Sequence, residues 1–324
     1  MVEASAPTMH TPTLAQRLAT GWRLLSGTLL APQPCPACGS TDRTELLRRD
    51  RYFLPVSLSV CNTCSLVHLA QPLKPEAEGW FYQHCYPVLM GKGARQAAEM
   101  QRRHAQERAE ALHDLLDGTQ HLLDVGCGFG AFLSLASSVP LRSGVEPGGP
   151  QRAAAASLSA EVCFVPALID LPADRRPPDL VTLFHVLEHV GDPVGFLRQL
   201  RDLADPKAQF VIEVPDFTGD WSPLGLSAIH VSHRCYFTPQ SLQDVLGRAE
   251  LVITAMDRTP TPIYPGNLRV VAERSDAGAT AIALAAPVPA LPAAQESLRR
   301  GLSNPWRTGQ MRTAIRFLRV VLGV

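Results

Sequence analysis

The sequence predicts an α/β protein with a doubly wound, mostly parallel, seven-stranded sheet and a small cysteine-rich module in front of it. Three observations support this fold class. Strand-like apolar runs alternate with helical runs over residues 95–274, an order typical of parallel sheets. A glycine-rich turn follows one of these runs, at residues 126–130. Two C-x-x-C pairs lie within residues 34–70.

Composition limits the kind of protein. A chain of 324 residues is long enough for one large domain and one small domain. Acidic and basic residues balance at 30 each, so there is no strong nucleic-acid signal and a small-molecule partner is expected. We find no signal-peptide pattern and no apolar run of about 18 residues, which predicts a cytoplasmic protein without a transmembrane segment. The sequence leaves the oligomeric state open.

Five segments follow from composition and periodicity. They are a tail with an amphipathic helix (1–33), the cysteine-rich module (34–70), a connector (71–94), the α/β domain (95–274), and an Ala/Pro linker with a basic amphipathic helix (275–324). The apolar face of the first helix would carry Leu14, Leu18, Leu25 and Leu29. The apolar face of the last helix would carry Met311, Ile315, Leu318 and Leu322. We expect the last helix to dock on its own domain.

The elements of the α/β domain are predicted in turn. Strands are expected at 121–125, 142–146, 161–165, 179–184, 209–214, 251–257 and 267–273. Helices are expected at 95–118 and near 130–138, 150–159, 192–204 and 239–249.

The cysteine-rich module has the spacing of a zinc ribbon. Cys35 and Cys38 are separated from Cys61 and Cys64 by 22 residues, close to the spacing of two zinc knuckles that close a tetrahedral site. Four thiolates leave no open position, so this Zn2+ should be structural. The remaining cysteines are scattered, which suits a reducing compartment better than a disulfide framework.

The glycine-rich turn lies in "LLDVGCGFGAF", where an apolar strand reaches Asp124 and three glycines then open a helix. Glycine allows a ligand to approach the backbone and permits backbone conformations that side chains disfavour. Read loosely, Gly126, Gly128 and Ala131 match the dinucleotide pattern G-x-G-x-x-A, with Glu146 placed to hold ribose hydroxyls. A nicotinamide oxidoreductase is therefore one possible interpretation.

The complete D-x-G-x-G-x-G pattern resembles motif I of the class I S-adenosylmethionine (SAM) methyltransferases, whose fold is Rossmann-like. The resemblance implies that the acidic residue contacts the methionine portion of SAM, and that the carboxylate after the next strand binds both ribose hydroxyls. Relatives often carry an Asp for the adenine amine where this chain has Ala167, so backbone around Ala167 and Leu168 would meet the adenine. The implied cofactor-binding residues thus include Asp124, Gly126, Cys127, Gly128, Gly130, Glu146, Ala167 and Leu168.

The stretch "HVLEHV" matches H-x-x-E-H, a pattern of one class of zinc peptidases. A strand leads directly into His185, and Gly191-Asp192-Pro193 follows His189 closely, so there is room for about one helical turn. A peptidase helix is therefore not predicted. In the methyltransferase interpretation, Phe184 and His185 flank the cofactor. His189 either faces the acceptor or only ties down the loop.

The four-cysteine module, "VLEHV" and a later H-x-x-Y-F-T segment are together similar to the sugar C-methyltransferases of deoxysugar pathways, over residues 34–274. This chain lacks their C-terminal domain and the acidic residue before the Tyr-Phe pair. The resemblance implies His233 as the first candidate base and His189 as the second, with Tyr236 as a hydrogen-bonding partner. The alternative for His233 is a buried histidine bonded to the backbone.

The sequence thus predicts SAM-dependent methylation of a small-molecule acceptor, such as a sugar or a secondary-metabolite intermediate. Two alternatives remain: an RNA methyltransferase, and a non-catalytic zinc-ribbon interaction protein that retains the SAM-binding fold.

Overall fold

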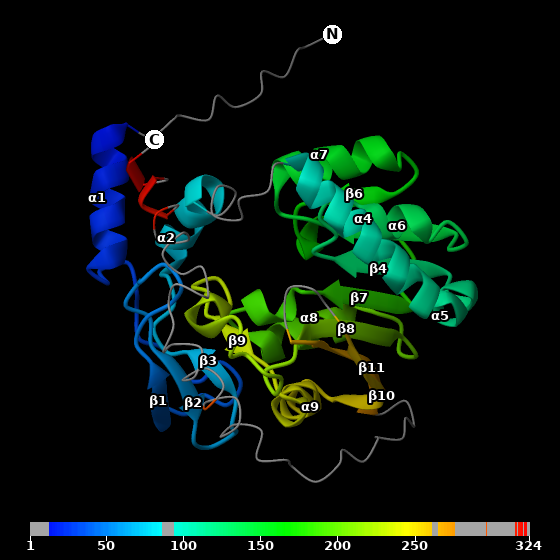
Figure 1. The fold of residues 1–324 in the computed structure, drawn as a ribbon. Helices are drawn as coiled ribbons and strands as arrows, with labels where there is room; N and C mark the ends of the chain where they lie inside the picture. Colours follow the sequence, from blue (N-terminus) through cyan, green and yellow to red (C-terminus); the bar gives the residue numbers. More distant parts are fainter. Residues whose placement is uncertain are drawn as a thin grey trace.

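The computed structural model describes residues 13–85, 94–260 and 265–275, together with residue 296 and parts of a C-terminal helix at 315, 317–319 and 321–322. Two sheets organise these residues, one of seven strands and one of four. Figure 1 shows them side by side, with helices packed around the larger sheet and α1 (Leu14–Leu25) beside the smaller one.

The large sheet has the order β10-β11-β8-β7-β4-β5-β6. Strands β8, β7, β4, β5 and β6 run parallel, whereas β11 is antiparallel to both β8 and β10. This confirms the predicted fold class and each predicted strand of the domain. The bounds are β4 His121–Val125, β5 Leu141–Val145, β6 Cys163–Val165, β7 Leu180–Phe184, β8 Gln209–Pro215, β10 Leu251–Thr259 and β11 Asn267–Arg274.

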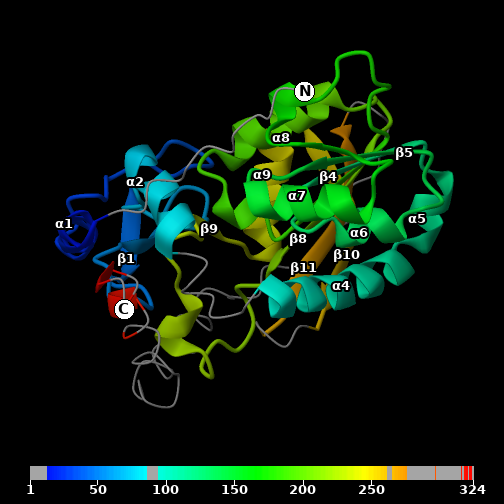
Figure 2. The same ribbon diagram turned by 90° about the horizontal axis from the view of Figure 1, so that it is seen from above.

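Helices cover both faces of this sheet (Figure 2). Their bounds are α4 Ala94–Ala111, α5 His113–Gly118, α6 Ala131–Leu135, α7 Gly149–Leu158, α8 Pro193–Leu203 and α9 Pro239–Arg248. The helix predicted over 95–118 is thus interrupted at Leu112, whose backbone (φ −109°, ψ 14°) departs from helical geometry. The other predicted helices of the domain are confirmed.

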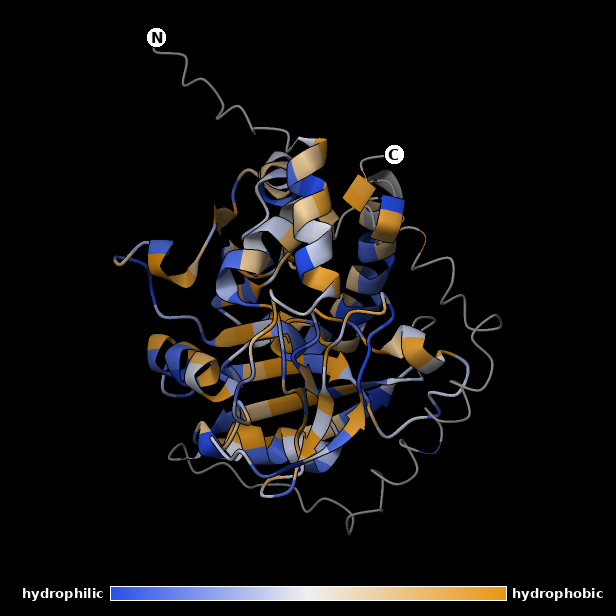
Figure 3. Ribbon diagram, turned by 90° about the vertical axis from the view of Figure 1, so that its left-hand side faces the viewer, coloured by the Kyte–Doolittle hydropathy of each residue, from blue (hydrophilic) through white to orange (hydrophobic). Residues whose placement is uncertain are grey.

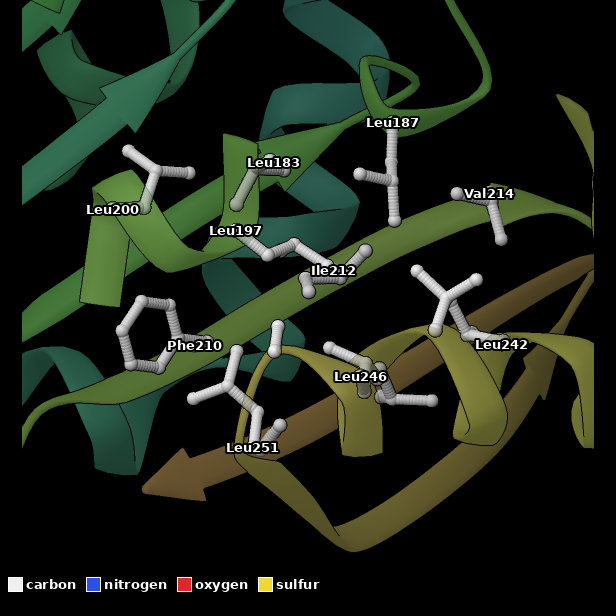
Figure 4. Close-up of a cluster of buried hydrophobic side chains, with 14 of the residues drawn as sticks. Leu183, Leu187, Leu197, Leu200, Phe210, Ile212, Val214, Leu242, Leu246 and Leu251 are labelled. Carbon is white, nitrogen blue, oxygen red and sulfur yellow. The ribbon is translucent and has the colours of Figure 1, made fainter. Parts of the chain in front are cut away.

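The alternation of side chains along β8 explains why two layers of helices pack on one sheet. Phe210 and Ile212 belong to the apolar cluster that contains leucines of α8 and α9, as Figure 4 shows. Val211 lies between them and belongs to the cluster built with α4 and α6. A strand buried on both faces needs apolar residues at successive positions, which explains the unbroken apolar run of β8.

The small sheet has the order β1-β2-β3-β9. Its first three strands come from the cysteine-rich module: β1 Arg43–Leu47, β2 Leu58–Cys61 and β3 Val67–Leu69. The fourth, β9 (Cys235–Tyr236), comes from the long segment after β8 and pairs antiparallel with β3. A short helix α2 (Pro75–Trp80) and one π-helical turn (Phe81–Cys85) follow the module. The module therefore shares a sheet with a segment of the α/β domain.

The two terminal helices pack differently from the sequence prediction. In α1, Leu14, Leu18 and Leu25 are exposed, whereas Gly21 and Leu24 face inward. The reason is a close approach at Gly21, where an added Cβ would lie 2.1 Å from Cγ1 of Val321. Figure 3 views this side of the molecule.

The C-terminal helix also packs through residues other than those predicted. Among the described residues of this helix, Phe317 and Val321 are buried, and Ile315, Leu318 and Leu322 are exposed. The predicted docking face is therefore wrong for these three residues, and Met311 lies outside the described residues. Within the described parts of the chain, no helix combines the length and apolar character needed to cross a membrane.

Candidate functional site

The glycine turn lies at the carboxyl end of β4, which runs between β7 and β5 in the large sheet. Gly126, Gly128 and Gly130 have φ values of 71°, 55° and 74°, a region that disfavours side chains. The N–H groups of Gly126 and Cys127 both donate to the carbonyl of Val145, which ties the turn to the end of β5. The turn is therefore held in a left-handed path that brings its backbone to the sheet edge.

Glu146 follows β5 directly beside this turn. Its Oε2 accepts the N–H of Gly128 at 3.0 Å, and its Oε1 accepts the N–H of Gly148 at 2.6 Å. Burial raises the pKa of this carboxyl. A carboxylate offers about four lone-pair sites, so each oxygen still has room for one more donor. A vicinal diol, such as that of a ribose, has two adjacent hydroxyl donors, which match the two remaining acceptor sites of Glu146.

Asp124 is the next-to-last residue of β4 and is 3% exposed. One of its oxygens, Oδ1, accepts the hydroxyl proton of Thr182 at 2.7 Å. Burial raises the pKa of Asp124 to about 7, while the Thr182 bond opposes the shift. The carboxyl lies beside the glycine turn, on the strand next to that of Glu146.

Ala167 and Leu168 follow β6 at the same edge. Val125, Val145 and Val165 are paired in register across β4, β5 and β6, so residues after these strands lie next to one another. Ala167 is exposed and precedes a single 3-10 turn, Leu168–Asp170, in which Leu168 is buried. The structure thus brings the predicted cofactor residues of β4, β5 and β6 together.

Gln101 of α4 is a contact that the sequence did not indicate. Its Oε1 accepts the N–H of Phe129 at 3.0 Å, and a Cβ added at Gly128 would lie 2.5 Å from its Nε2. The amide therefore covers the glycine turn from the helix side. One glutamine in a charged, alanine-rich helix gives no local signal for such a role.

Phe184 ends β7, and His185 begins the loop after it. The Phe184 ring meets the Phe132 ring edge-on at 5.0 Å between centroids, and the Arg108 guanidinium lies 4.3 Å from its centroid. His185 has a φ of 58° and donates its backbone N–H to the carbonyl of Glu213 at 2.9 Å. The left-handed backbone at a non-glycine residue marks this as a constrained corner.

A buried charge cluster surrounds His185. Its Nδ1 lies 3.2 Å from Oε1 of Glu188 and its Nε2 lies 3.5 Å from Oε1 of Glu213. Arg108 also pairs with Glu213, at 2.5 Å. Burial opposes protonation of His185, but the two carboxylates raise its pKa to about 9. Burial likewise opposes ionisation of Glu213, but His185 and Arg108 lower its pKa to about 2.

The next turn of the loop, Leu187–His189, is a single 3-10 turn, as expected from the space before Gly191. His189 Nδ1 lies 2.9 Å from the backbone carbonyl of Ser232. A carbonyl only accepts, so Nδ1 carries a proton and Nε2 holds the lone pair of the neutral ring. The rings of His189 and His233 meet edge-on at 4.7 Å. Two histidines 44 positions apart in the sequence therefore lie together.

His233 is buried, and this burial lowers its pKa well below the usual value, assisted by nearby positive charge. Tyr236 contacts a neighbouring residue of the same loop: its hydroxyl accepts the N–H of His230 at 2.9 Å and lies 3.3 Å from the carbonyl of His230. Its ring lies 6.0 Å from the His233 ring. Tyr236 thus shapes the loop that carries His233.

The cysteine-rich module braces this loop from the other side, which the sequence did not predict. The Tyr52 hydroxyl lies 3.0 Å from Nε2 of His230, and Oδ2 of Asp50 accepts the N–H of Val231 at 3.1 Å. Asp50 also accepts the N–H groups of Tyr52 and Leu54, so its carboxylate joins two distant segments. Module and loop form one buried unit.

The four predicted zinc ligands gather at one end of the module. Sγ of Cys35 lies 3.5 Å from Sγ of Cys64, and the same distance separates Cys38 from Cys61. Zinc–sulfur bonds of about 2.3 Å place tetrahedral ligands about 3.8 Å apart, whereas a disulfide needs about 2.05 Å. All four sulfurs lie within 4.8 Å of one another, so the donor set fits a tetrahedral metal.

Comparisons with known proteins agree with this geometry. Residues 97–255 match a family model described as a methyltransferase domain. No curated protein matches the sequence. Among solved structures, the 1,6-didemethyltoxoflavin-N1-methyltransferase of Burkholderia thailandensis, solved with S-adenosylhomocysteine (SAH), is 19% identical, has a TM-score of 0.50, and covers 66% of this chain and 97% of its own.

Two further structures are more distant. The magnesium protoporphyrin IX methyltransferase of Synechocystis PCC 6803, solved with SAH, is 19% identical with a TM-score of 0.45, covering 61% of this chain and 97% of its own. Mitomycin 7-O-methyltransferase is 18% identical with a TM-score of 0.47, covering 61% of this chain and 62% of its own. The described α/β domain therefore has the Rossmann-like fold of the SAM-dependent methyltransferases, and residues 97–255 are similar to the methyltransferase-domain family.

Proposed function

We propose that this protein transfers the methyl group of SAM to a small-molecule acceptor. One observation carries the proposal. Asp124, the glycine turn and Glu146 gather at one edge of the sheet, and the half-buried His189 and the buried His233 lie together beyond the end of the next strand, β7. Cofactor-type groups therefore lie at the ends of β4 and β5, and acceptor-type groups lie beyond the end of the neighbouring strand β7.

The residues at the sheet edge fit SAM. Glu146 retains one acceptor site on each oxygen for the ribose hydroxyls, and charge-assisted bonds of this kind contribute about 1.5–3 kcal/mol each. Asp124 would hold the methionine portion, and the backbone at Ala167 and Leu168 would meet the adenine. Phe184 and His185 would flank the cofactor at the end of β7. Bound SAM supplies a methyl group that is already activated on a positively charged sulfur.

His233 and His189 would manage the acceptor proton. Burial keeps His233 neutral at pH 7, so its ring can accept a proton from an acceptor group. His189 holds its lone pair on Nε2, because Nδ1 donates to the Ser232 carbonyl. Tyr236 would act on His233 through the loop backbone. A base of this kind contributes about 10²–10⁴-fold in rate.

For the acceptor, we propose a sugar or a secondary-metabolite intermediate. The support is the sequence pattern: a four-cysteine module, the V-L-E-H-V loop and the segment His233 to Thr238 occur in the order seen in sugar C-methyltransferases.

We further propose that Cys35, Cys38, Cys61 and Cys64 bind a structural Zn2+. The spacing of the sulfurs supports this, and a filled four-thiolate shell leaves no position for a substrate. None of the eight cysteines, all of which are described, forms a disulfide, which supports a reducing compartment such as the cytoplasm.

The test is calorimetric titration with SAM and SAH, followed by incubation with isotope-labelled SAM and fractionated metabolite extracts. We expect both ligands to bind, and label to appear in a small molecule. The matched pair of variants is Glu146→Gln, which should weaken SAH binding, and Asp174→Asn, an exposed carboxylate that should leave it unchanged. Absence of SAM and SAH binding would overturn the proposal, and salt-sensitive labelling of RNA would favour the RNA alternative.

A further inference from the structure

The structure separates the members of the "HVLEHV" pattern into two groups. His185 belongs to the charge cluster with Glu213 and Arg108. Glu188 and His189 instead lie with His233, and one potential ligand atom from each of these three residues falls within 4.8 Å of the others. The grouping combines a short loop with a segment more than 40 positions away, so it is not the helical pair of a peptidase.

Glu188 is the unusual member of this group. The residue is 1% exposed, and Oε1 is engaged by His185 at 3.2 Å. Oε2 is buried and has no hydrogen-bond partner among the described residues. A buried carboxylate oxygen without a partner is costly, and a bound cation is one of the groups that can satisfy it.

His189 is oriented in the manner of a metal ligand. Nδ1 of His189 is fixed by the Ser232 carbonyl, which directs the lone pair to Nε2. Ligating histidines typically donate their second ring nitrogen to such a carbonyl or to a carboxylate. The loop that carries His233 is braced by Tyr52 and Tyr236 through His230. The His189 ring and the backbone segment that carries His233 are therefore positioned before any ligand arrives.

We propose that Glu188, His189 and His233 bind a divalent first-row transition-metal ion, such as Zn2+, separate from the four-cysteine site. Two imidazoles and one carboxylate are the donors that such ions accept, with bonds of about 2.0–2.2 Å. Ligand atoms within 4.8 Å of one another reach this geometry by small side-chain rotations. Three protein ligands leave an open position.

The role of the ion rests on the proposed function, whereas its binding does not. In the loaded site, His189 and His233 serve as ligands, and an acceptor oxygen occupies the open position. Coordination would lower the pKa of that oxygen, so its proton would be released to water instead of to a histidine base. The oxygen would then form a bond to the methyl carbon of SAM, and the sulfur–methyl bond would break with its electron pair left on SAH. The acceptor class is then narrowed to molecules that present a hydroxyl or enol oxygen.

The experiment uses the full-length protein, equilibrated with excess Zn2+, desalted and analysed for zinc per chain by mass spectrometry of the metal. We expect about two equivalents in the wild type, one of them in the four-cysteine site. Glu188→Gln and His233→Asn should each lower the content to about one equivalent. Replacement of the ion by Co2+ identifies the retained site, because thiolate ligands give an intense charge-transfer absorption that nitrogen and oxygen ligands lack.

The control is His113→Gln, which removes an exposed histidine flanked by Asp114 and Asp117 and should keep the second equivalent. Circular dichroism and SAH binding are measured on each sample, and His189→Asn replaces any variant that does not fold. Loss of the second equivalent only in the cluster variants supports the site. A wild type with about one equivalent, or a second equivalent that persists in the cluster variants or disappears in the control, overturns it. SAH binding without a second metal refutes this inference alone, whereas a lack of SAH binding refutes the proposed function.

Discussion

The proposed cofactor edge and the proposed acceptor side of this protein are built in different ways. Most residues of the cofactor edge come from one stretch, 124–168, and lie at or just after the ends of β4, β5 and β6, which pair in parallel register. Residues of the acceptor side come from the loop after β7, from the segment before β9 and from the cysteine-rich module. The first is specified locally, and the second depends on contacts between distant segments.

Because of this difference, we expect a substitution in the cofactor edge or in the acceptor side to impair only the region in which it lies. Damage to the module should disturb the acceptor side and spare SAH binding, because β3 pairs with β9 while β4, β5 and β6 hold the cofactor edge. Damage at the cofactor edge should do the reverse.

The largest expected effect is loss of zinc. Cys38→Ser should abolish folding of the module, because a structural zinc of this kind supplies about 10–16 kcal/mol of apparent free energy. Methyl transfer by the Cys38→Ser protein should disappear while its SAH binding, measured by calorimetry, persists. Cys163→Ser, outside the cluster, is the control and should keep both. Methyl transfer by the Cys38→Ser protein would contradict the coupling of module and acceptor side.

Glu146→Ala should affect only the cofactor edge. Removal of two charge-assisted bonds costs about 3 kcal/mol or more, so the SAH dissociation constant should rise at least about a hundredfold. Zinc content should remain at the wild-type level. An unchanged dissociation constant would mean that the ribose does not lie at this carboxylate.

Protonation of Asp124 should be visible in the pH dependence of stability. Burial raises its pKa from 3.8 to about 7, so the folded state holds this proton more tightly than the unfolded state does. Its contribution to stability is therefore complete below pH 3.8 and is lost as the pH rises through about 7. Asp124→Asn should reduce the fall in melting temperature between these limits, whereas Asp174→Asn should not. Parallel curves for the wild type and Asp124→Asn would refute the assignment.

Tyr52→Phe tests the link between module and acceptor loop. Loss of the hydrogen bond to His230 should loosen the loop that carries His233 and raise the activation free energy by about 1 kcal/mol. This corresponds to about a fivefold fall in kcat. The SAH dissociation constant should not change. A parallel loss in SAH affinity would show that the cofactor edge and the acceptor side are not separate.

The smallest effect is expected from Ala167→Asp. A carboxylate there would accept from the adenine amine and add about 0.5–1.5 kcal/mol, or up to about tenfold in SAH affinity. Ala173→Asp makes the same charge change at another exposed position and should have no effect. Equal affinities for both variants would place the adenine elsewhere.

The features that the sequence predicts are those specified locally, and the features that it does not predict depend on contacts between distant segments. Strands β4 to β8 and the glycine turn could be predicted because their signals, apolar runs and glycine spacing, lie within a few residues. The packing face of α1 could not, because periodicity marks an apolar stripe but does not reveal that Gly21 admits Val321. The close contact between Gly21 and Val321 determines which face of α1 is buried.

The site residues that the sequence did not predict share one property: their partners lie far away in the sequence. Tyr52 meets His230 across 178 positions, and Arg108 meets Glu213 across 105. No local pattern distinguishes these residues from other tyrosines and arginines. "HVLEHV" is an intermediate case, since its position after β7 could be predicted, but the grouping of Glu188 with His233 required the fold.

The most direct measurement is a crystal structure of the protein with SAH. The account predicts the ribose hydroxyls within hydrogen-bonding distance of both Glu146 oxygens, with the sulfur facing the His189 and His233 side of the crevice. A ligand bound elsewhere, or a ribose held away from Glu146, would contradict it.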